Sequence, residues 1–197
     1  MTDPIRSYLN IDEQSPLFPT HLHTGEFWEG LGRAVATYGF LEKVLGRAIY
    51  ALTATTVVAE ADIAKAVAKW EKILESCLKD PLGGLIPKFE GALKNHDQGI
   101  DSSEIELVTL LRNAKKLRDL LCHALWFPPD DLDNALPWFV NRDLEIPETS
   151  VDVKFLANTQ AHVAELACAV VSSVTGRGIQ FPGSNGPGMP LRRSSNC

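Results

Sequence analysis

Hydrophobic residues recur along most of the chain at intervals of three and four, which is the spacing of one face of an α-helix. The pattern predicts five helices, over residues 25–53, 62–79, 85–95, 103–124 and 151–174. The first helix has an apolar face made of Phe27, Leu31, Val35, Tyr38, Leu41, Leu45, Ile49 and Leu52. In the second, the residues expected to face the core are Ile63, Val67, Trp70, Ile73, Leu74 and Cys77.

Turn residues and helix breakers indicate how these helices begin, end and connect. Ser103 and Glu106 have the spacing of a capping box at the start of the fourth helix. The prolines of "FPPDD" end that helix, because proline cannot continue it. The runs "ALPWFV" and "LEIP", joined by "NRD", predict a β-hairpin between 135 and 147 as the only β-structure. The predicted fold is all-α, an antiparallel bundle of about five helices with a small β-hairpin inserted before the last helix.

The same pattern divides the chain into one domain and two terminal segments. Residues 1–23 contain prolines and polar residues and are expected to form an N-terminal arm. Residues 24–176 form the helical domain. Residues 177–197 are rich in Gly, Pro and Ser, and they are expected to form a flexible C-terminal tail.

Four glycines of the first helix, Gly25, Gly32, Gly39 and Gly46, are spaced by seven and share one stripe of its surface. A glycine inside a helix costs about 0.5–1 kcal/mol relative to alanine, so several in register need a reason. The best physical reason is the close approach of another helix. The sequence leaves open whether that helix belongs to the same chain or to a second one.

Composition and charge narrow the class of protein. The 197 residues are 45% hydrophobic and 22% charged, as in globular domains, and the formal net charge is −6. So acidic a chain is poorly suited to coat nucleic acid without specificity, since that binding depends on Lys and Arg at phosphates. We expect no signal peptide and no membrane span, and therefore a soluble cytoplasmic protein. The cysteines and histidines lack the spacing of a metal site, so we expect no metal and no cofactor.

The end of the fourth helix carries the candidate chemistry, in the segment "RDLLCH". Arg118 falls within the apolar stripe of that helix, where an arginine must be paired, reach solvent or line an interface. Asp119 and His123 are four residues apart and share a face, so the carboxylate can hydrogen-bond the imidazole. Arg112, Lys115 and Lys116 lie one and two turns earlier and make this the most basic stretch of the chain.

An arginine followed by a polar residue, with a histidine four to six residues after the arginine, resembles the signature of the HEPN (higher eukaryotes and prokaryotes nucleotide-binding) domain family. In this chain the matching residues are Arg118, Asp119 and His123, at the end of a late helix in an antiparallel bundle. The first helix, "YGFLEKVLGRAIYAL", is also similar to family members and has an acidic Glu42 midway. The resemblance covers residues 25–175.

The resemblance implies a metal-independent endoribonuclease, of a class that includes toxins and defence effectors. Such enzymes are homodimers in which two motif helices build one composite site, and some are controlled by a nucleotidyltransferase-like antitoxin. His123 would then transfer a proton, Arg118 would stabilise the phosphoryl group, and Asp119 would orient His123. Arg112, Lys115 and Lys116 would contact the RNA substrate. Since Arg118 and His123 are about 140° apart on one helix, two chains would bring such groups together better than one.

Two alternatives remain open on the sequence. The Arg-Asp-His set can be structural, in a non-catalytic helical interaction module of the same family. The protein can also be a nucleotide-binding module, in which Trp126, Phe127 and Trp138 stack on a base. These aromatic residues can equally pack the hairpin onto the bundle.

Overall fold

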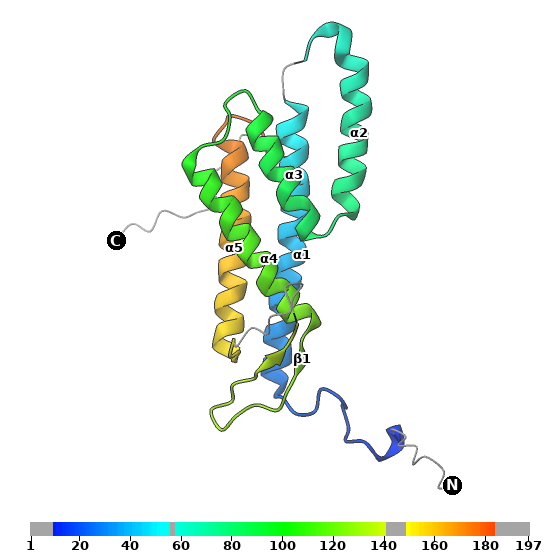
Figure 1. Cartoon of the computed structure of the whole chain (residues 1–197), viewed down its shortest axis with the longest axis vertical. Coiled ribbons are helices and arrows are strands. Elements are labelled where there is room, and N and C mark those ends of the chain that lie inside the picture. Colours follow the sequence, from blue (N-terminus) through cyan, green and yellow to red (C-terminus); the bar gives the residue numbers. More distant parts are fainter. Residues whose placement is uncertain (1–9, 56–57, 141–148, 184–197) are drawn as a thin grey trace, which may run out of the picture.

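The computed structural model describes residues 10–55, 58–140 and 149–183. Over these residues it is a bundle of five α-helices, each running opposite to the one before it (Figure 1). The helices are α1 (Gly25–Ala54), α2 (Ile63–Lys79), α3 (Leu82–Asn95), α4 (Ser102–His123) and α5 (Val153–Thr175). Short 3-10 turns, Ile11–Glu13 and Glu60–Asp62, precede α1 and α2. The predicted fold class is confirmed.

The long helix α1 is the centre of the bundle. It packs along most of α5, and α3 and α2 lie against other parts of its surface (Figure 1). Its predicted apolar face is buried except for Val35, which is partly covered. The side chains with less than 2% exposure include Tyr38, Leu41, Leu45 and Leu52 from α1, and Phe89, Leu111 and Leu156 from α3, α4 and α5.

Helix α2 stands away from the rest of the bundle (Figure 1). Among the helices it packs mainly on α1, and of its predicted core residues only Cys77 is buried. Ile63, Val67 and Leu74 are 49%, 42% and 43% exposed, so the prediction that they face the core was wrong. The physical reason is that α1 covers only one side of the apolar stripe of α2.

The glycine stripe of α1 divides into two parts. A Cβ added at Gly46 would lie 3.2 Å from the carbonyl oxygen of Cys77, so this glycine permits close packing of α2. A Cβ added at Gly25, Gly32 or Gly39 would meet nothing within 4 Å. The close helix contact is therefore within the chain at Gly46, and the other three glycines face open space.

The β-hairpin before the last helix is confirmed, with a different partner for its predicted first strand. β2 (Pro137–Trp138) lies in the predicted "ALPWFV" run, but it pairs antiparallel with β1 (Leu125–Trp126). The prediction that all β-structure lies between 135 and 147 was therefore wrong, because the chain becomes extended directly after α4 ends. The second predicted strand, 144–147, lies outside the described residues. Trp126 packs edge-on against Phe27 of α1, 5.1 Å between ring centroids, so this ring joins the hairpin to the bundle.

The capping box of α4 is formed by Asp101 and Glu104, so its assignment to Ser103 and Glu106 was wrong by two residues. The Asp101 carboxylate accepts from the Glu104 N–H at 2.9 Å, and the Glu104 carboxylate accepts from the Asp101 N–H at 3.1 Å. Arg177 also donates to both oxygens of Glu104, at 2.7 and 2.9 Å, with both side chains buried. Phe181 is 8% exposed, so the described part of the predicted tail, 177–183, packs on the bundle.

Candidate functional site

The candidate site lies at the C-terminal end of α4, where this helix passes α1 and the start of α3. Arg118 is partly buried, with 27% of its side chain exposed. One of its terminal nitrogens, Nη2, is 3.8 Å from Glu42 Oε1, and the other, Nη1, is 3.4 Å from Asp119 Oδ1. Of the three possibilities left open for an arginine in the apolar stripe, the structure shows pairing. Both distances are long for a charged hydrogen bond, so the guanidinium donors are held in place without being saturated.

Glu42 is fixed by a second contact that the sequence did not predict. Its Oε1 accepts a hydrogen bond of 2.9 Å from the backbone N–H of Leu82, the first residue of α3. A carboxylate is favourable there, because the first N–H groups of a helix have no partner in the helix and lie at its positive end. Glu42 therefore connects the start of α3 to Arg118. The sequence shows an acidic residue midway along α1, but no pattern in it indicates this contact.

Asp119 is held by cations on its own helix. Lys115 Nζ lies 2.5 Å from Asp119 Oδ2, and Arg118 contacts the other carboxylate oxygen. Within the described part of the chain no hydrogen bond joins Asp119 to His123, although the four-residue spacing allows one. In this conformation the carboxylate positions Arg118 and Lys115 rather than the imidazole.

His123 is the last residue of α4 and is exposed to solvent. Its ring lies over that of Phe139, which follows β2, with centroids 6.5 Å apart and an interplanar angle of 24°. The histidine is thus accessible to a large substrate and limited in its orientation by the hairpin. Because it is exposed, replacing it removes little packing.

The basic residues before the motif are largely neutralised within the chain. Arg112 Nη2 lies 2.5 Å from Glu90 Oε2 on α3, and Lys115 pairs with Asp119. Lys116 is exposed, and among the described residues it has no ion pair. Against the part of the chain that the structure describes, the predicted RNA-binding face therefore offers one free cation rather than three.

Two further polar groups lie near Arg118 and neither is an activated nucleophile. Burial raises the pKa of the Cys122 thiol, and the nearby Arg118 only partly opposes this. Burial also raises the pKa of Tyr38, with the neighbouring Cys122 as a smaller cause. The Tyr38 hydroxyl is buried and has no hydrogen-bond partner in the described structure. At neutral pH both groups are protonated.

The described residues contain no group of three or more His, Cys, Asp and Glu side chains arranged to hold a metal ion. No helix in the described ranges is long and apolar enough to cross a membrane. Comparisons of the chain with protein-family models, curated proteins and solved structures give no match.

Proposed function

We propose that the protein is a metal-independent endoribonuclease of the HEPN type, which cleaves RNA by transesterification. The observation that carries the proposal is that a partly buried, incompletely saturated Arg118 and an exposed His123 both lie at the C-terminal end of α4. A guanidinium held in this way can donate to phosphoryl oxygens as negative charge develops on them. An accessible imidazole can accept or donate a proton near neutral pH.

In the proposed reaction the 2′-oxygen of a ribose attacks the adjacent phosphorus, and the bond from phosphorus to the 5′-oxygen breaks. One histidine takes the proton of the 2′-hydroxyl, and another group protonates the leaving 5′-oxygen. The products are a 2′,3′-cyclic phosphate and a free 5′-hydroxyl. Since Arg118 and His123 lie about 140° apart around α4, we infer a homodimer in which two copies of α4 supply the groups of one site.

The role proposed for Asp119 follows its observed contacts. Because it is paired with Lys115 and Arg118, it acts on the reaction by positioning the guanidinium. Glu42 has the same role from the other side. The activity is of a kind that cells must control, and a nucleotidyltransferase-like antitoxin is the partner that the resemblance suggests.

The test is incubation of the purified protein with RNA, with and without EDTA, beside the His123→Ala and Arg118→Lys variants. We expect cleavage that persists in EDTA and leaves cyclic phosphate ends. His123→Ala should abolish it, and Arg118→Lys should lower the rate by about 10²–10³-fold through loss of the planar donor fork. Cys122→Ser is the matched control on the same turn and should keep full activity. Cleavage that needs a divalent metal, or full activity in His123→Ala, would refute the proposal.

A second candidate is a non-catalytic helical interaction module. It is favoured by the ion pairs that occupy Arg112 and Lys115, and by the absence of an Asp119–His123 hydrogen bond among the described residues. In that case the Arg118 cluster joins α1, α3 and α4, and the Arg118→Lys and Glu42→Gln variants should melt several degrees lower without any activity to lose.

A further inference from the structure

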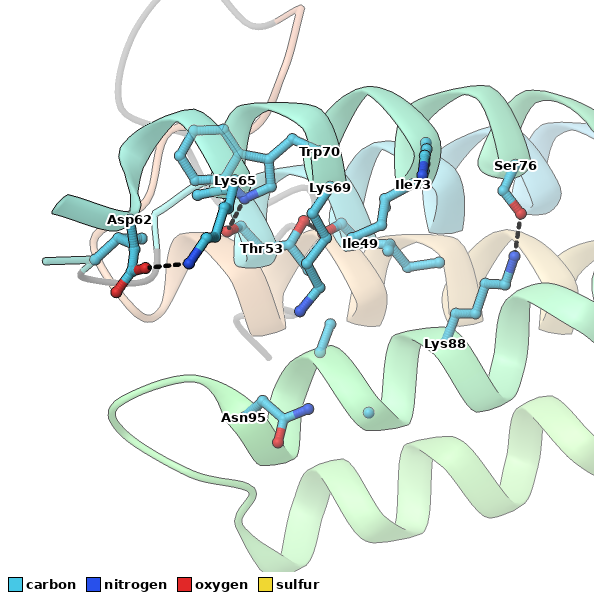
Figure 2. A pocket seen from close by; sticks show the side chains of 15 residues that line it. Ile49, Thr53, Asp62, Lys65, Lys69, Trp70, Ile73, Ser76, Lys88 and Asn95 are labelled. Atoms are coloured by element: carbon cyan, nitrogen blue, oxygen red, sulfur yellow. Dashed lines mark hydrogen bonds and ion pairs between the residues drawn. The ribbon is translucent and has the colours of Figure 1, made fainter. Parts of the chain in front are cut away.

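A cleft between α2 and α3 is lined by none of the residues of the Arg118 cluster. It opens where α2 stands away from the bundle, and it is bounded by α2 on one side, α3 on the other and α1 at its floor (Figure 2). Its volume is about 890 Å³, within the range of ligand pockets in proteins. Lys88, which contacts Ser76 and Asp80, bridges α3 and α2 at one end of the cleft.

Lysines gather along this cleft although the whole chain is acidic. Lys65, Lys69, Lys72 and Lys88 line it, and Asp62 is the one carboxylate among its lining residues. Lys69 and Lys72 make no ion pair in the described part of the chain. Lys65 is only loosely paired with Asp62, at 3.3 Å with both side chains largely exposed. The cleft therefore holds free positive charge that the predicted RNA-binding face on α4 has largely lost.

The shape of the cleft separates charged from apolar groups. Lys65, Lys69 and Lys72 lie on successive turns of one face of α2, rising about 4.5–6 Å from each to the next. Deeper in the cleft the lining is apolar, with Ile49, Ile73 and Ala92. Trp70 also lines it, and its ring is fixed because Nε1 donates to the Thr53 carbonyl at 2.8 Å (Figure 2). A row of cations above an apolar and aromatic floor is the arrangement with which proteins bind single-stranded nucleic acid.

We propose that the α2–α3 cleft binds a short single-stranded segment of RNA. The backbone phosphates lie along Lys69 and Lys72, and the bases turn inward onto Trp70 and the apolar floor. The choice of RNA rests on the proposed function. The shared chemistry, a phosphate and a base joined through a ribose, also belongs to a free nucleotide, and the experiment separates these two sources.

The experiment uses the full chain carrying His123→Ala, so that bound RNA is not cleaved, and a fluorescein-labelled single-stranded RNA of ten nucleotides. Binding is followed by fluorescence anisotropy at several salt concentrations. Adding Lys69→Ala and Lys72→Ala should weaken binding at least tenfold. The slope of log affinity against log salt concentration should become shallower by about 1.4, because about two phosphate contacts are lost. The matched control is Lys43→Ala with Lys154→Ala, two exposed lysines of α1 and α5 that do not line the cleft, which removes the same charge and should change affinity less than threefold.

A second pair of variants tests the cleft itself without changing charge. Gly91 lines the cleft, and a Cβ added there would meet nothing within 4 Å. Gly91→Phe should therefore fill the cleft while the bundle folds, and it should weaken RNA binding at least tenfold. Gly91→Ala leaves most of the cleft open and should bind as the parent does.

Three results would overturn the inference. They are no binding of the RNA, an equal or larger loss from the Lys43 and Lys154 variants than from the α2 variants, or unchanged binding in Gly91→Phe. Complete displacement of the RNA by 1 mM ATP, with equal affinity for a dinucleotide and the ten-mer, would assign the cleft to a free nucleotide instead. If RNA cleavage by an active His123 chain is unchanged by the cleft substitutions, RNA binding at the cleft is refuted and the ribonuclease proposal is kept. If RNA binds in the cleft but the parent protein cleaves no RNA, the ribonuclease proposal is refuted and RNA binding at the cleft is kept.

Discussion

Two arginines of this protein are paired in very different ways. Arg177 is 7% exposed and donates to both oxygens of Glu104 at 2.7 and 2.9 Å, and it also donates to the carbonyl of Gly99. Arg118 is 27% exposed and only approaches its two carboxylates. The first arrangement pairs a buried charge through both terminal nitrogens, although Arg177 Nε has no hydrogen-bond partner among the described residues, and it fixes the end of α5 to the start of α4. The second leaves donors that a substrate can use.

The buried pair should matter greatly for stability. Arg177→Ala leaves the Glu104 carboxylate buried without its partner, so we expect the free energy of unfolding to fall by about 3–5 kcal/mol. Urea denaturation at neutral pH measures this. The control is Arg33→Ala, which removes an exposed pair with Glu29 and should cost at most about 1 kcal/mol. A loss below about 1 kcal/mol in Arg177→Ala would show that the Glu104 pair contributes little.

Single residues also show where sequence reasoning ends. That Arg118 must be paired, reach solvent or line an interface follows from its place in an apolar stripe, since an unpaired charge is costly there. That the partner is Glu42 does not follow, because the contact depends on how α1, α3 and α4 meet. Likewise Asp119 could pair with His123 or Lys115 at the same four-residue separation, and periodicity does not distinguish the two. The structure selects Lys115.

At the scale of the helices, the apolar periodicity predicted all five helices, and the turn residues and prolines predicted their ends to within a few residues. The exposure of α2 could not be predicted in this way. Its stripe of apolar residues is as regular as that of α1, but a stripe does not show how much of it another element covers. The strand pairing failed for a related reason. The two residues of β1 follow α4 too closely to give a pattern of alternation.

The glycines of α1 allow a matched prediction about helix packing. Gly39→Ala adds a methyl group in open space and removes the helix penalty of glycine, so unfolding should require about 0.5–1 kcal/mol more free energy. Gly46→Ala places its methyl 3.2 Å from the Cys77 carbonyl oxygen, so α2 must shift. The free energy of unfolding should therefore not rise in this variant. Urea denaturation compares the two. Equal gains would mean that α2 does not pack closely at Gly46, and a loss at Gly39 would mean that a second chain covers this stripe.

For the whole molecule, one chain does not bring its own motif residues together. Arg118 faces α1 and the start of α3, where Glu42 holds it, while His123 lies on the solvent side next to Phe139. A ribonuclease built from such a chain needs a second copy, and a symmetric dimer supplies the same two groups from the opposite direction. The assembly is therefore the part of the proposed function that can be tested apart from RNA specificity.

Mixing two inactive variants tests this assembly. Arg118→Ala keeps His123, and His123→Ala keeps Arg118, so a mixed dimer contains one site with an arginine from one chain and a histidine from the other. After unfolding and refolding the two together, roughly half of the dimers should be mixed, each with its one composite site carrying a single arginine and a single histidine. Activity should therefore return to at most about half of that of the parent. Light scattering should give twice the 21.6 kDa mass of the chain for every sample. The same variants refolded separately are the control and should stay inactive. If the mixture stays inactive although its dimers form, Arg118 and His123 do not combine across the dimer in the way proposed. If light scattering shows a monomer at micromolar concentration, the composite site does not exist.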